Sequence, residues 1–299
     1  MRGWLLAAAL PLLAACGGAD AVAVGSKDFV EQDVLAELIS QELEERGVPV
    51  ERRFHFGGSK LTHEALVNDE LDLYVEYTGT ALVAVLGRDP IHDADSVYTV
   101  VEEAYLDRWD LVLAPPLGFE NTFAVIVRAG DADSLGLEAI GDLAAVDEEW
   151  TAGFGPEFMS REDGYPGLKE AYGIAFGEVK QMDLGLLYRA LDQGEIDVAV
   201  GNSTDGQIAA FDLRVLNDNR NFFPPYEAVP VVRRETIERH PRVWDVLQRL
   251  EGVVTAEQMR ELNRTVVVED ADIPRAVRRW RARHLRPGKT APIAPEDTT

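Results

Sequence analysis

Cysteine, histidine and basic side chains are scarce in this 299-residue sequence, and each shortage excludes a kind of protein. One cysteine cannot form an intramolecular disulfide and does not supply a pair of metal-binding thiolates. The five histidines are scattered, with no two at the spacing of a zinc site, so we expect no metal. The 53 acidic residues outnumber the 29 basic ones and give a net charge of −24. Such a surface repels nucleic acid and favours a cationic, zwitterionic or neutral ligand.

Motifs of the common enzyme classes are also missing. The chain contains no G-x-S-x-G, H-E-x-x-H or G-x-x-x-x-G-K-[ST] pattern, which removes the most frequent hydrolase and phosphate-binding signatures. The glycines Gly153 and Gly155 are followed by Pro156 and lack the third glycine of a dinucleotide-binding fingerprint. We therefore expect neither catalysis nor a cofactor.

A hydrophobic stretch that could cross a bilayer is absent as well, because the apolar run from Trp4 to Leu13 is too short for about 30 Å. Residues 1–16 instead predict a secretory signal peptide. Their end, Leu13-Ala14-Ala15-Cys16, resembles a bacterial lipobox, which implies cleavage before Cys16 and lipidation of its sulfur. Residues 17–21 would be a tether, and the chain would be extracytoplasmic, lipid-anchored to a bacterial membrane in the periplasm or at the cell surface. The alternative is an ordinary secreted protein with a chance cysteine.

The full sequence is 46% hydrophobic, and its length suits one large or two medium folded domains. From Ala21 onward short strands alternate with helices, which predicts an α/β fold with largely parallel sheets. The expected strands are 22–25, 50–56, 71–77, 122–128, 150–154, 176–182 and 196–201. The expected helices are 31–46, 59–67, 136–145, 166–172 and 184–192, followed by a mostly helical segment 234–285. The Pro/Thr-rich tail 287–299 is expected to be disordered.

Two segments repeat each other at an offset of 125 residues. Ala65-Leu66-x-x-x-Glu70-Leu71-Asp72-Leu73 matches Ala190-Leu191-x-x-x-Glu195-Ile196-Asp197-Val198. Each strand then runs into a hydroxyl-rich turn, which begins at Tyr77 in one case and at Asn202 in the other. The repeat predicts two α/β lobes facing each other across a cleft, with these turns at the carboxyl ends of strands, where open α/β sheets bind ligands. A chance recurrence of strand–helix units is the other interpretation.

Several of the turns carry aromatic, hydroxyl or cationic side chains. Tyr77-Thr78-Gly79-Thr80 stands where a strand meets a helix N-terminus, whose free N–H groups favour a carboxylate. Taken singly, each such residue also has a structural interpretation. Tyr77 and Phe123 would be core residues, Lys27 and Arg161 surface residues, and Tyr226 a turn residue.

A set of motifs resembles the substrate-binding proteins of osmoprotectant ABC importers, which take up glycine betaine, choline, carnitine and proline betaine. In chain order these motifs are Val24-Gly-Ser-Lys-Asp-Phe-Val-Glu-Gln32, Gly57-Gly-Ser59, Glu76-Tyr-Thr-Gly-Thr80, Pro156-Glu-Phe158, Arg161-x-Asp-Gly164, Ser203-Thr-Asp-Gly206 and Phe222-Phe-Pro-Pro-Tyr226. They span about residues 22–275. The resemblance implies a two-lobed periplasmic-binding-protein fold of type II, with lobe 1 formed by 22–118 and 222–286 and lobe 2 by 119–221.

The resemblance also implies which residues bind the ligand. In the family an aromatic cage surrounds the quaternary ammonium, while a lysine, a threonine and an arginine hold the carboxylate. A trimethylammonium group has no N–H donor, and a well-placed ring contributes about 0.5–2 kcal/mol. A carboxylate instead needs strong, charged donors. The positions that match the family are Lys27, Thr80 and Arg161 for the carboxylate, Tyr77 and Tyr226 for the cage, and Asn121 beside them.

Two cage positions depart from the family. Phe123 and Asn202 stand where tyrosine is usual, and Asn202 is the larger departure because it removes a ring and adds an amide. Tyr77 and Asn202 are equivalent under the 125-residue repeat, so the two lobes have become unlike. We expect either weaker binding of simple betaines, or a bulkier or more polar zwitterion whose extra group meets Asn202.

As a receptor of this kind, the chain would be a monomer that binds a small zwitterionic or cationic solute. Its partners would be an ABC permease, the ATPase of that permease, and a membrane through the lipid anchor. Two alternatives stay open, a lipid-tethered sensor that passes ligand occupancy to a signalling partner, and a surface-anchored hydrolase. The hydrolase would need a nucleophile–base pair in the cleft, and the sequence offers no recognisable one.

Overall fold

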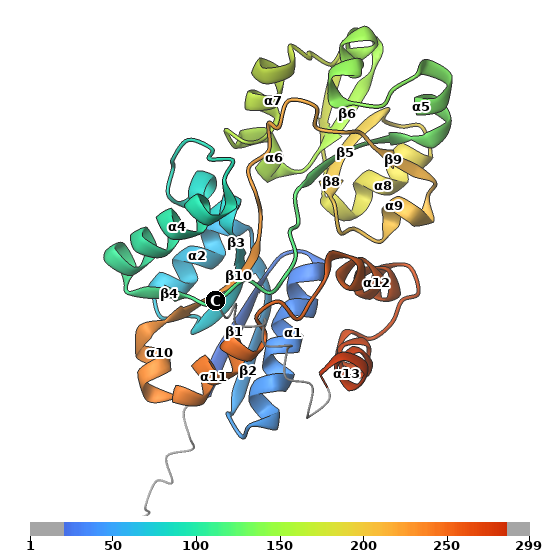
Figure 1. The fold of residues 1–299 in the computed structure, drawn as a ribbon. Helices are drawn as coiled ribbons and strands as arrows, with labels where there is room; N and C mark the ends of the chain where they lie inside the picture. The colour runs from blue at the N-terminus through green and yellow to red at the C-terminus, as the bar shows by residue number, and fades with distance from the viewer. Residues whose placement is uncertain (1–20, 286–299) are drawn as a thin grey trace, which may run out of the picture.

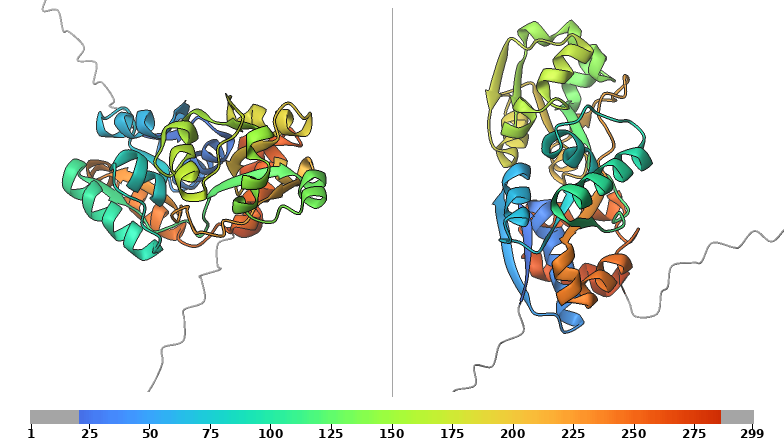
Figure 2. Two further views of the ribbon diagram at one scale, coloured as in Figure 1. Left: turned by 90° about the horizontal axis from the view of Figure 1, so that it is seen from above. Right: turned by 90° about the vertical axis from the view of Figure 1, so that its left-hand side faces the viewer.

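The structure is a computed structural model that describes residues 21–285, and its strands form two separate five-stranded sheets (Figure 1). The expected signal peptide, the lipidation site at Cys16 and the expected tail 287–299 lie outside the described residues. The two sheets and their helices form two bodies stacked along the long axis of the molecule, as the right-hand view of Figure 2 shows. Among residues 21–285, no helix has the length and apolar character needed to cross a bilayer.

The first sheet has the strand order β2-β1-β3-β10-β4. These strands are β1 (Val22–Lys27), β2 (Val50–Gly57), β3 (Leu73–Tyr77), β4 (Leu111–Leu113) and β10 (Ala228–Arg233). Side chains alternate along each strand between two hydrophobic cores, so that Leu73 and Val75 lie in one core and Tyr74 in the other. The helices of this half are α1 (Val30–Glu45), α2 (Ser59–Val67), α4 (Ala94–Trp109), α10 (Arg234–Arg239), α11 (Pro241–Arg249), α12 (Ala256–Val267) and α13 (Ile273–His284). The last two, α12 and α13, pack against α1 rather than against the sheet. A single turn, α3 (Thr78–Thr80), continues into a π-helical turn Ala81–Val85.

The second sheet has the order β7-β6-β8-β5-β9 and the same alternation, with Val125 in one core and Ile126 in the other. Its strands are β5 (Phe123–Arg128), β6 (Thr151–Phe154), β7 (Glu178–Gln181), β8 (Val198–Asn202) and β9 (Leu213–Val215). Its helices are α5 (Ala129–Leu135), α6 (Pro156–Ser160), α7 (Tyr165–Tyr172), α8 (Leu184–Asp192) and α9 (Gln207–Ala210).

Four of the five strands in each sheet run in one direction, as expected of largely parallel sheets, but each sheet also holds one reversed strand, β10 or β5. In the first, β1 pairs in parallel with β2 and β3, but β10 is antiparallel to β3 and β4. In the second, β6 is parallel to β7 and β8, but β5 is antiparallel to β8 and β9. The reason is that the chain enters β5 and β10 directly from the other sheet, without the helical crossover that parallel neighbours need.

The helix expected at 136–145 was also misplaced. The helix α5 lies earlier and ends at Gly136, whose φ of +69° is the left-handed conformation that terminates helices. A short 3₁₀ turn, Ile140–Ala145, follows it.

The sequence repeat corresponds to a structural repeat. The carboxylate of Asp72, just before β3, accepts a hydrogen bond from the Ala23 N–H at 2.8 Å. The carboxylate of Asp197, just before β8, accepts one from the Thr151 N–H at 3.0 Å. Each aspartate thus fastens a central strand to its parallel neighbour, and the strands end at the equivalent positions Tyr77 and Asn202.

Two extended segments connect the sheets and run side by side in opposite directions (Figure 1). The N–H of Ala228 donates to the carbonyl of Phe119 at 3.1 Å, and the N–H of Asn121 donates to the carbonyl of Tyr226 at 3.0 Å. Because Asn121 and Tyr226 belong to these connectors, they lie between the two sheets.

Candidate functional site

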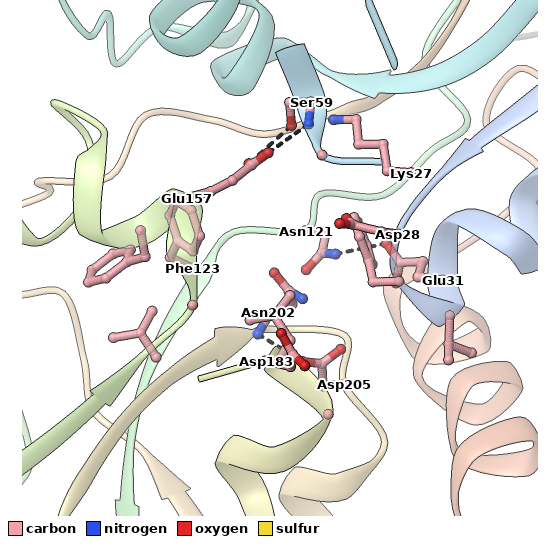
Figure 3. A pocket seen from close by; sticks show the side chains of 18 of the residues that line it. Lys27, Asp28, Glu31, Ser59, Asn121, Phe123, Glu157, Asp183, Asn202 and Asp205 are labelled. Atoms are coloured by element: carbon pink, nitrogen blue, oxygen red, sulfur yellow. Dashed lines mark hydrogen bonds between the residues drawn. The ribbon is translucent and has the colours of Figure 1, made fainter. Parts of the chain in front are cut away.

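A cleft of about 700 Å³ lies between the two sheets and is lined from both (Figure 3). All the expected ligand-binding residues line it, namely Lys27, Tyr77, Thr80, Asn121, Phe123, Arg161, Asn202 and Tyr226. Tyr77 and Thr80 come from the end of β3 and the following turn, whereas Asn202 comes from the end of β8. The carboxyl ends of the two central strands therefore face a common space, as expected of a cleft between α/β lobes.

One wall of the cleft is a cluster of aromatic rings around Phe123. The centroid of the Phe123 ring lies 4.9 Å from that of Phe158 and 5.6 Å from that of Tyr226, both in edge-on arrangements. The guanidinium carbon of Arg161 lies 5.2 Å from the same Phe123 centroid. The geometry already supports one cation on an aromatic face, which is the contact that a quaternary ammonium would use.

A second aromatic pair lines the cleft beside the first sheet. The rings of Phe29 and Tyr77 are stacked with their centroids 6.3 Å apart. Phe29 and Phe158 were not predicted to line the site, although both lie within the family motifs given above. Each is an aromatic residue close to the end of a strand. The sequence alone cannot tell whether such a residue lines a binding site or belongs to the hydrophobic core.

Lys27 is buried and already has an anionic partner. Its Nζ donates to the carboxylate of Glu76, and the two side chains are 2% and 0% exposed. Glu76 also accepts a hydrogen bond from the Tyr74 hydroxyl at 2.9 Å. The expected carboxylate donor is thus part of a neutral, internally paired unit at the floor of the cleft.

Arg161 is paired in the same way. Its Nε and Nη2 donate to the two carboxylate oxygens of Asp163 at 2.7 and 2.5 Å, a bidentate arrangement. Its Nη1 lies 3.2 Å from the hydroxyl of Thr80, so residues of both sheets meet here. The Tyr226 hydroxyl donates to Asp163 at 2.6 Å, and burial together with the Asp163 charge raises the pKa of Tyr226. Asp163 therefore fixes both an expected carboxylate donor and an expected cage ring.

Glu31, for which the sequence predicted no role, is a buried acceptor of several hydrogen bonds. The four side-chain donors to its carboxylate are Tyr77 Oη at 2.6 Å, Asn121 Nδ2 at 2.8 Å, Thr204 Oγ1 at 2.5 Å and Asn263 Nδ2 at 2.7 Å. They come from β3, a connector, the turn after β8 and α12, so Glu31 joins both halves of the molecule. Burial raises the pKa of Glu31, although the hydrogen bonds oppose that rise.

Asn202 lines the cleft beside Phe123, with which it pairs in the β5–β8 ladder. Its N–H donates to Asp205 at 3.0 Å, and the Tyr188 hydroxyl donates to the same carboxylate. The first sheet presents the Tyr77 ring at the end of its central strand. At the equivalent place the second sheet presents the Asn202 amide beside the Asp205 carboxylate (Figure 3).

Acidic side chains outnumber basic ones along the cleft. Its lining includes the acidic side chains of Asp28, Glu31, Glu157, Asp183 and Asp205, against the basic side chains of Lys27 and Arg161. Within residues 21–285 no group of three or more histidine, cysteine or acidic residues could hold a metal ion. Chemically, the arrangement suits binding of an organic cation between rings and carboxylates.

Comparison with known proteins identifies the family of this chain. Residues 20–283 match the family described as the substrate-binding domain of ABC-type glycine betaine transport systems. The chain is 33% identical over 247 residues to the carnitine transport binding protein OpuCC of Listeria monocytogenes, covering 82% of this chain and 80% of that protein. It is 34% identical to the glycine-betaine-binding protein of Pseudomonas aeruginosa over 285 residues, with 90% and 89% covered.

A solved structure, described as that of a glycine betaine/carnitine/choline ABC transporter, is also similar. Its TM-score is 0.75 at 30% identity, and the match covers 88% of this chain and 98% of that one. The two-lobed α/β architecture expected from the sequence, the type II periplasmic-binding-protein fold, is thereby confirmed.

Proposed function

The chain belongs to the family of substrate-binding domains of ABC-type glycine betaine transport systems, and we propose that its own ligand is a small quaternary-ammonium solute held in the cleft between the lobes. The relatives are transport proteins rather than enzymes. A substrate-binding protein of an ABC transporter delivers a small solute to a permease, so a permease is the implied partner of this chain.

The observation that carries the proposal is the convergence of Tyr77, Phe123 and Tyr226 on one acidic cleft from three separate parts of the chain. The rings offer negative faces and methyl-sized apolar contacts to a trimethylammonium group, which water holds weakly. Lys27, Thr80 and Arg161 would face a carboxylate, if the ligand carries one, and Asn202 would meet any additional polar group.

Binding would be coupled to closure of the two lobes. We assign 22–118 and 222–286 to the first lobe and 119–221 to the second, which rotate about the paired connectors. A ligand that touches both lobes stabilises the closed form by its greater affinity for that form. The permease would then recognise the closed form.

The experiment is titration calorimetry on the purified chain with choline, glycine betaine and carnitine. The control ligand is 3,3-dimethylbutan-1-ol, which has the shape of choline without its charge. We expect saturable binding of at least one quaternary ammonium, at least tenfold tighter than the control ligand. If none of the three binds or raises the melting temperature, the proposed function is wrong.

A pair of matched variants locates the site. Phe123→Ala removes a cleft ring and should weaken binding about tenfold, since a ring contributes about 0.5–2 kcal/mol. Phe211→Ala removes a similarly half-buried ring of the same lobe that does not line the cleft, and should leave affinity within twofold. Equal effects of the two substitutions would contradict the assigned site.

The location of the chain is part of the proposal. We propose that it is an extracytoplasmic monomer, lipidated at Cys16 after removal of residues 1–15. Mass spectrometry of the mature N-terminus from a bacterial membrane fraction should find a diacylated cysteine, and Cys16→Ser should release the protein. An unmodified Cys16 in a membrane-free protein would refute the anchor without touching the ligand assignment.

A further inference from the structure

Asn202, the larger of the two departures from the aromatic cage, lies beside a ring that would hold the cation. It pairs with Phe123 in the antiparallel β5–β8 ladder, so the two side chains leave the same face of the sheet. The Cβ atoms of residues paired in this way are about 5 Å apart. A polar group carried a short distance from an ammonium on the Phe123 ring is therefore within reach of the Asn202 amide.

The surroundings of Asn202 accept hydrogen bonds. Its N–H donates to the carboxylate of Asp205 at 3.0 Å. Burial raises the pKa of Asp205, and hydrogen bonds from Tyr188 and from the backbone and side chain of Asn202 oppose that rise. Asp183, just before α8, lines the same side of the cleft, and its carboxylate makes no capping hydrogen bond to that helix (Figure 3). These carboxylates attract the NH₂ group of the Asn202 amide, which leaves the amide oxygen for a ligand.

Asn121 adds a second amide oxygen to this region. Its Nδ2 donates to the carboxylate of Glu31 at 2.8 Å, so its Oδ1 faces away from that carboxylate, toward the side of the cleft that carries Asn202 (Figure 3). The side chain lines the cleft and is only 6% exposed. Its Oδ1 is buried, and no group within residues 21–285 donates a hydrogen bond to it. A buried acceptor without a donor is unfavourable, so this part of the cleft favours a ligand that supplies one.

The charged donors of the cleft lie elsewhere. Lys27 and Asn202 are on opposite sides of it (Figure 3), and Nη1 of Arg161 lies beside the hydroxyl of Thr80, at 3.2 Å. These donors match the family, as do the rings of Tyr77 and Tyr226, so they do not distinguish this cleft from those of its relatives. Asn202 does, because it places an amide oxygen on a short side chain where a tyrosine ring is usual.

We propose that Asn202 is a specificity-determining residue whose side-chain oxygen accepts a hydrogen bond from the ligand, so that the cleft selects quaternary ammonium compounds with an O–H or N–H donor near the nitrogen. This inference rests on the proposed function, since it presupposes a quaternary-ammonium ligand. It adds the chemical character of the second polar group, which is a donor. A ligand without that donor leaves the Asn202 oxygen unpaired in the closed cleft.

The test compares the dissociation constants of choline and of its methyl ether, (2-methoxyethyl)trimethylammonium, by titration calorimetry. The ether keeps the charge, the trimethylammonium group and the oxygen of choline but lacks the O–H donor. Two variants have nearly the shape of asparagine: Asn202→Leu removes the acceptor, and Asn202→Asp keeps it while removing the NH₂ group. The matched control is Asn219→Leu, at an exposed residue between β9 and β10 that lies outside the cleft lining. Thermal unfolding verifies that each variant is folded.

We expect the wild type to bind choline at least about tenfold more tightly than the ether, because the ether leaves a buried acceptor unpaired. Asn202→Asp should keep this preference, Asn219→Leu should leave it within about twofold of the wild type, and Asn202→Leu should reduce it at least about fivefold.

Three results would overturn the inference. The wild type could bind both ligands equally. Asn202→Leu could keep the preference, as a limit on ligand size predicts, or Asn202→Asp could lose it, as an amide that donates to the ligand predicts. A wild type that binds no quaternary ammonium refutes the proposed function itself, so the two failures are distinguishable.

Discussion

Replacement of Glu31 by alanine tests whether the buried carboxylate holds the two lobes and the cage residue Tyr77 in place. The substitution removes the acceptor of four side-chain donors. A buried donor left unpaired costs about 1 kcal/mol at the lower end of measured values, so the four together cost about 4 kcal/mol. The loss is partly offset because burial of the carboxylate is itself unfavourable, which is why the pKa of Glu31 is raised.

We therefore expect Glu31→Ala to lower the free energy of unfolding by about 3 kcal/mol. At about 2 °C per kcal/mol for a chain of this size, the melting temperature would fall by about 6 °C. The control is Glu64→Ala, at an exposed position of α2. A melting temperature for Glu31→Ala within about 1 °C of that control would show that these hydrogen bonds contribute little.

The pH dependence supplies a second readout. Because the folded state raises the pKa of Glu31, that state keeps the proton to higher pH than the unfolded chain does. The resulting stability is fully present below the unfolded pKa of about 4.5 and is lost as pH rises through the folded pKa. Glu31→Gln cannot titrate, so the stability of the wild type relative to this variant should increase from pH 7 to pH 5. A constant or decreasing difference in thermal unfolding would refute the reasoning.

Three further predictions concern single residues. Asn202→Tyr restores a ring beside Phe123, its partner in the β5–β8 ladder. It should tighten glycine betaine binding about 2- to 30-fold, since a ring contributes about 0.5–2 kcal/mol. Unchanged or weaker affinity by titration calorimetry would count against the cage. Arg161→Lys loses the bidentate contact with Asp163. It should weaken glycine betaine binding at least tenfold, since hydrogen bonds to charged groups contribute about 1.5–3 kcal/mol. Wild-type affinity in the same titration would exclude Arg161 from the site. Burial lowers the pKa of His63 to about 4, so the free energy of unfolding should fall by about 3 kcal/mol as the pH drops from 6.5 to 4. His63→Phe should abolish that loss in urea titrations. A loss of equal size in the variant would show that another group causes it.

The strand–helix order and the duplicated unit could be predicted from the sequence because both depend on local patterns. Alternation of apolar residues gives strands, and the identical spacing around Asp72 and Asp197 reflects the same hydrogen bond in both lobes. The reversed directions of β5 and β10 could not be predicted in this way. They depend on whether a strand is entered through a helix or from the other lobe, which is a property of the whole chain path.

The candidate site shows the same division. Motif positions identified eight residues that line one cleft. For Tyr77 and Asn202 the reason is that both end the central strand of a sheet, and the carboxyl ends of such strands border the cleft. The partners of those residues were not predictable. Glu76 pairs with Lys27, and Asp163 pairs with Arg161. Glu31 accepts a hydrogen bond from Tyr77. These contacts form only when the side chains pack in the folded chain.

The sequence by itself determined the α/β class, the internal duplication and the types of side chain available to a ligand, because these follow from composition and short-range spacing. The tertiary structure decided which charged side chains remain available to a ligand. Glu157 and Ser59 are 98 positions apart and belong to different lobes, so only the closeness of the lobes lets that carboxylate accept a hydrogen bond from the Ser59 N–H. Electrostatic energy depends on distances between atoms, and distances between remote residues exist only once the chain has folded.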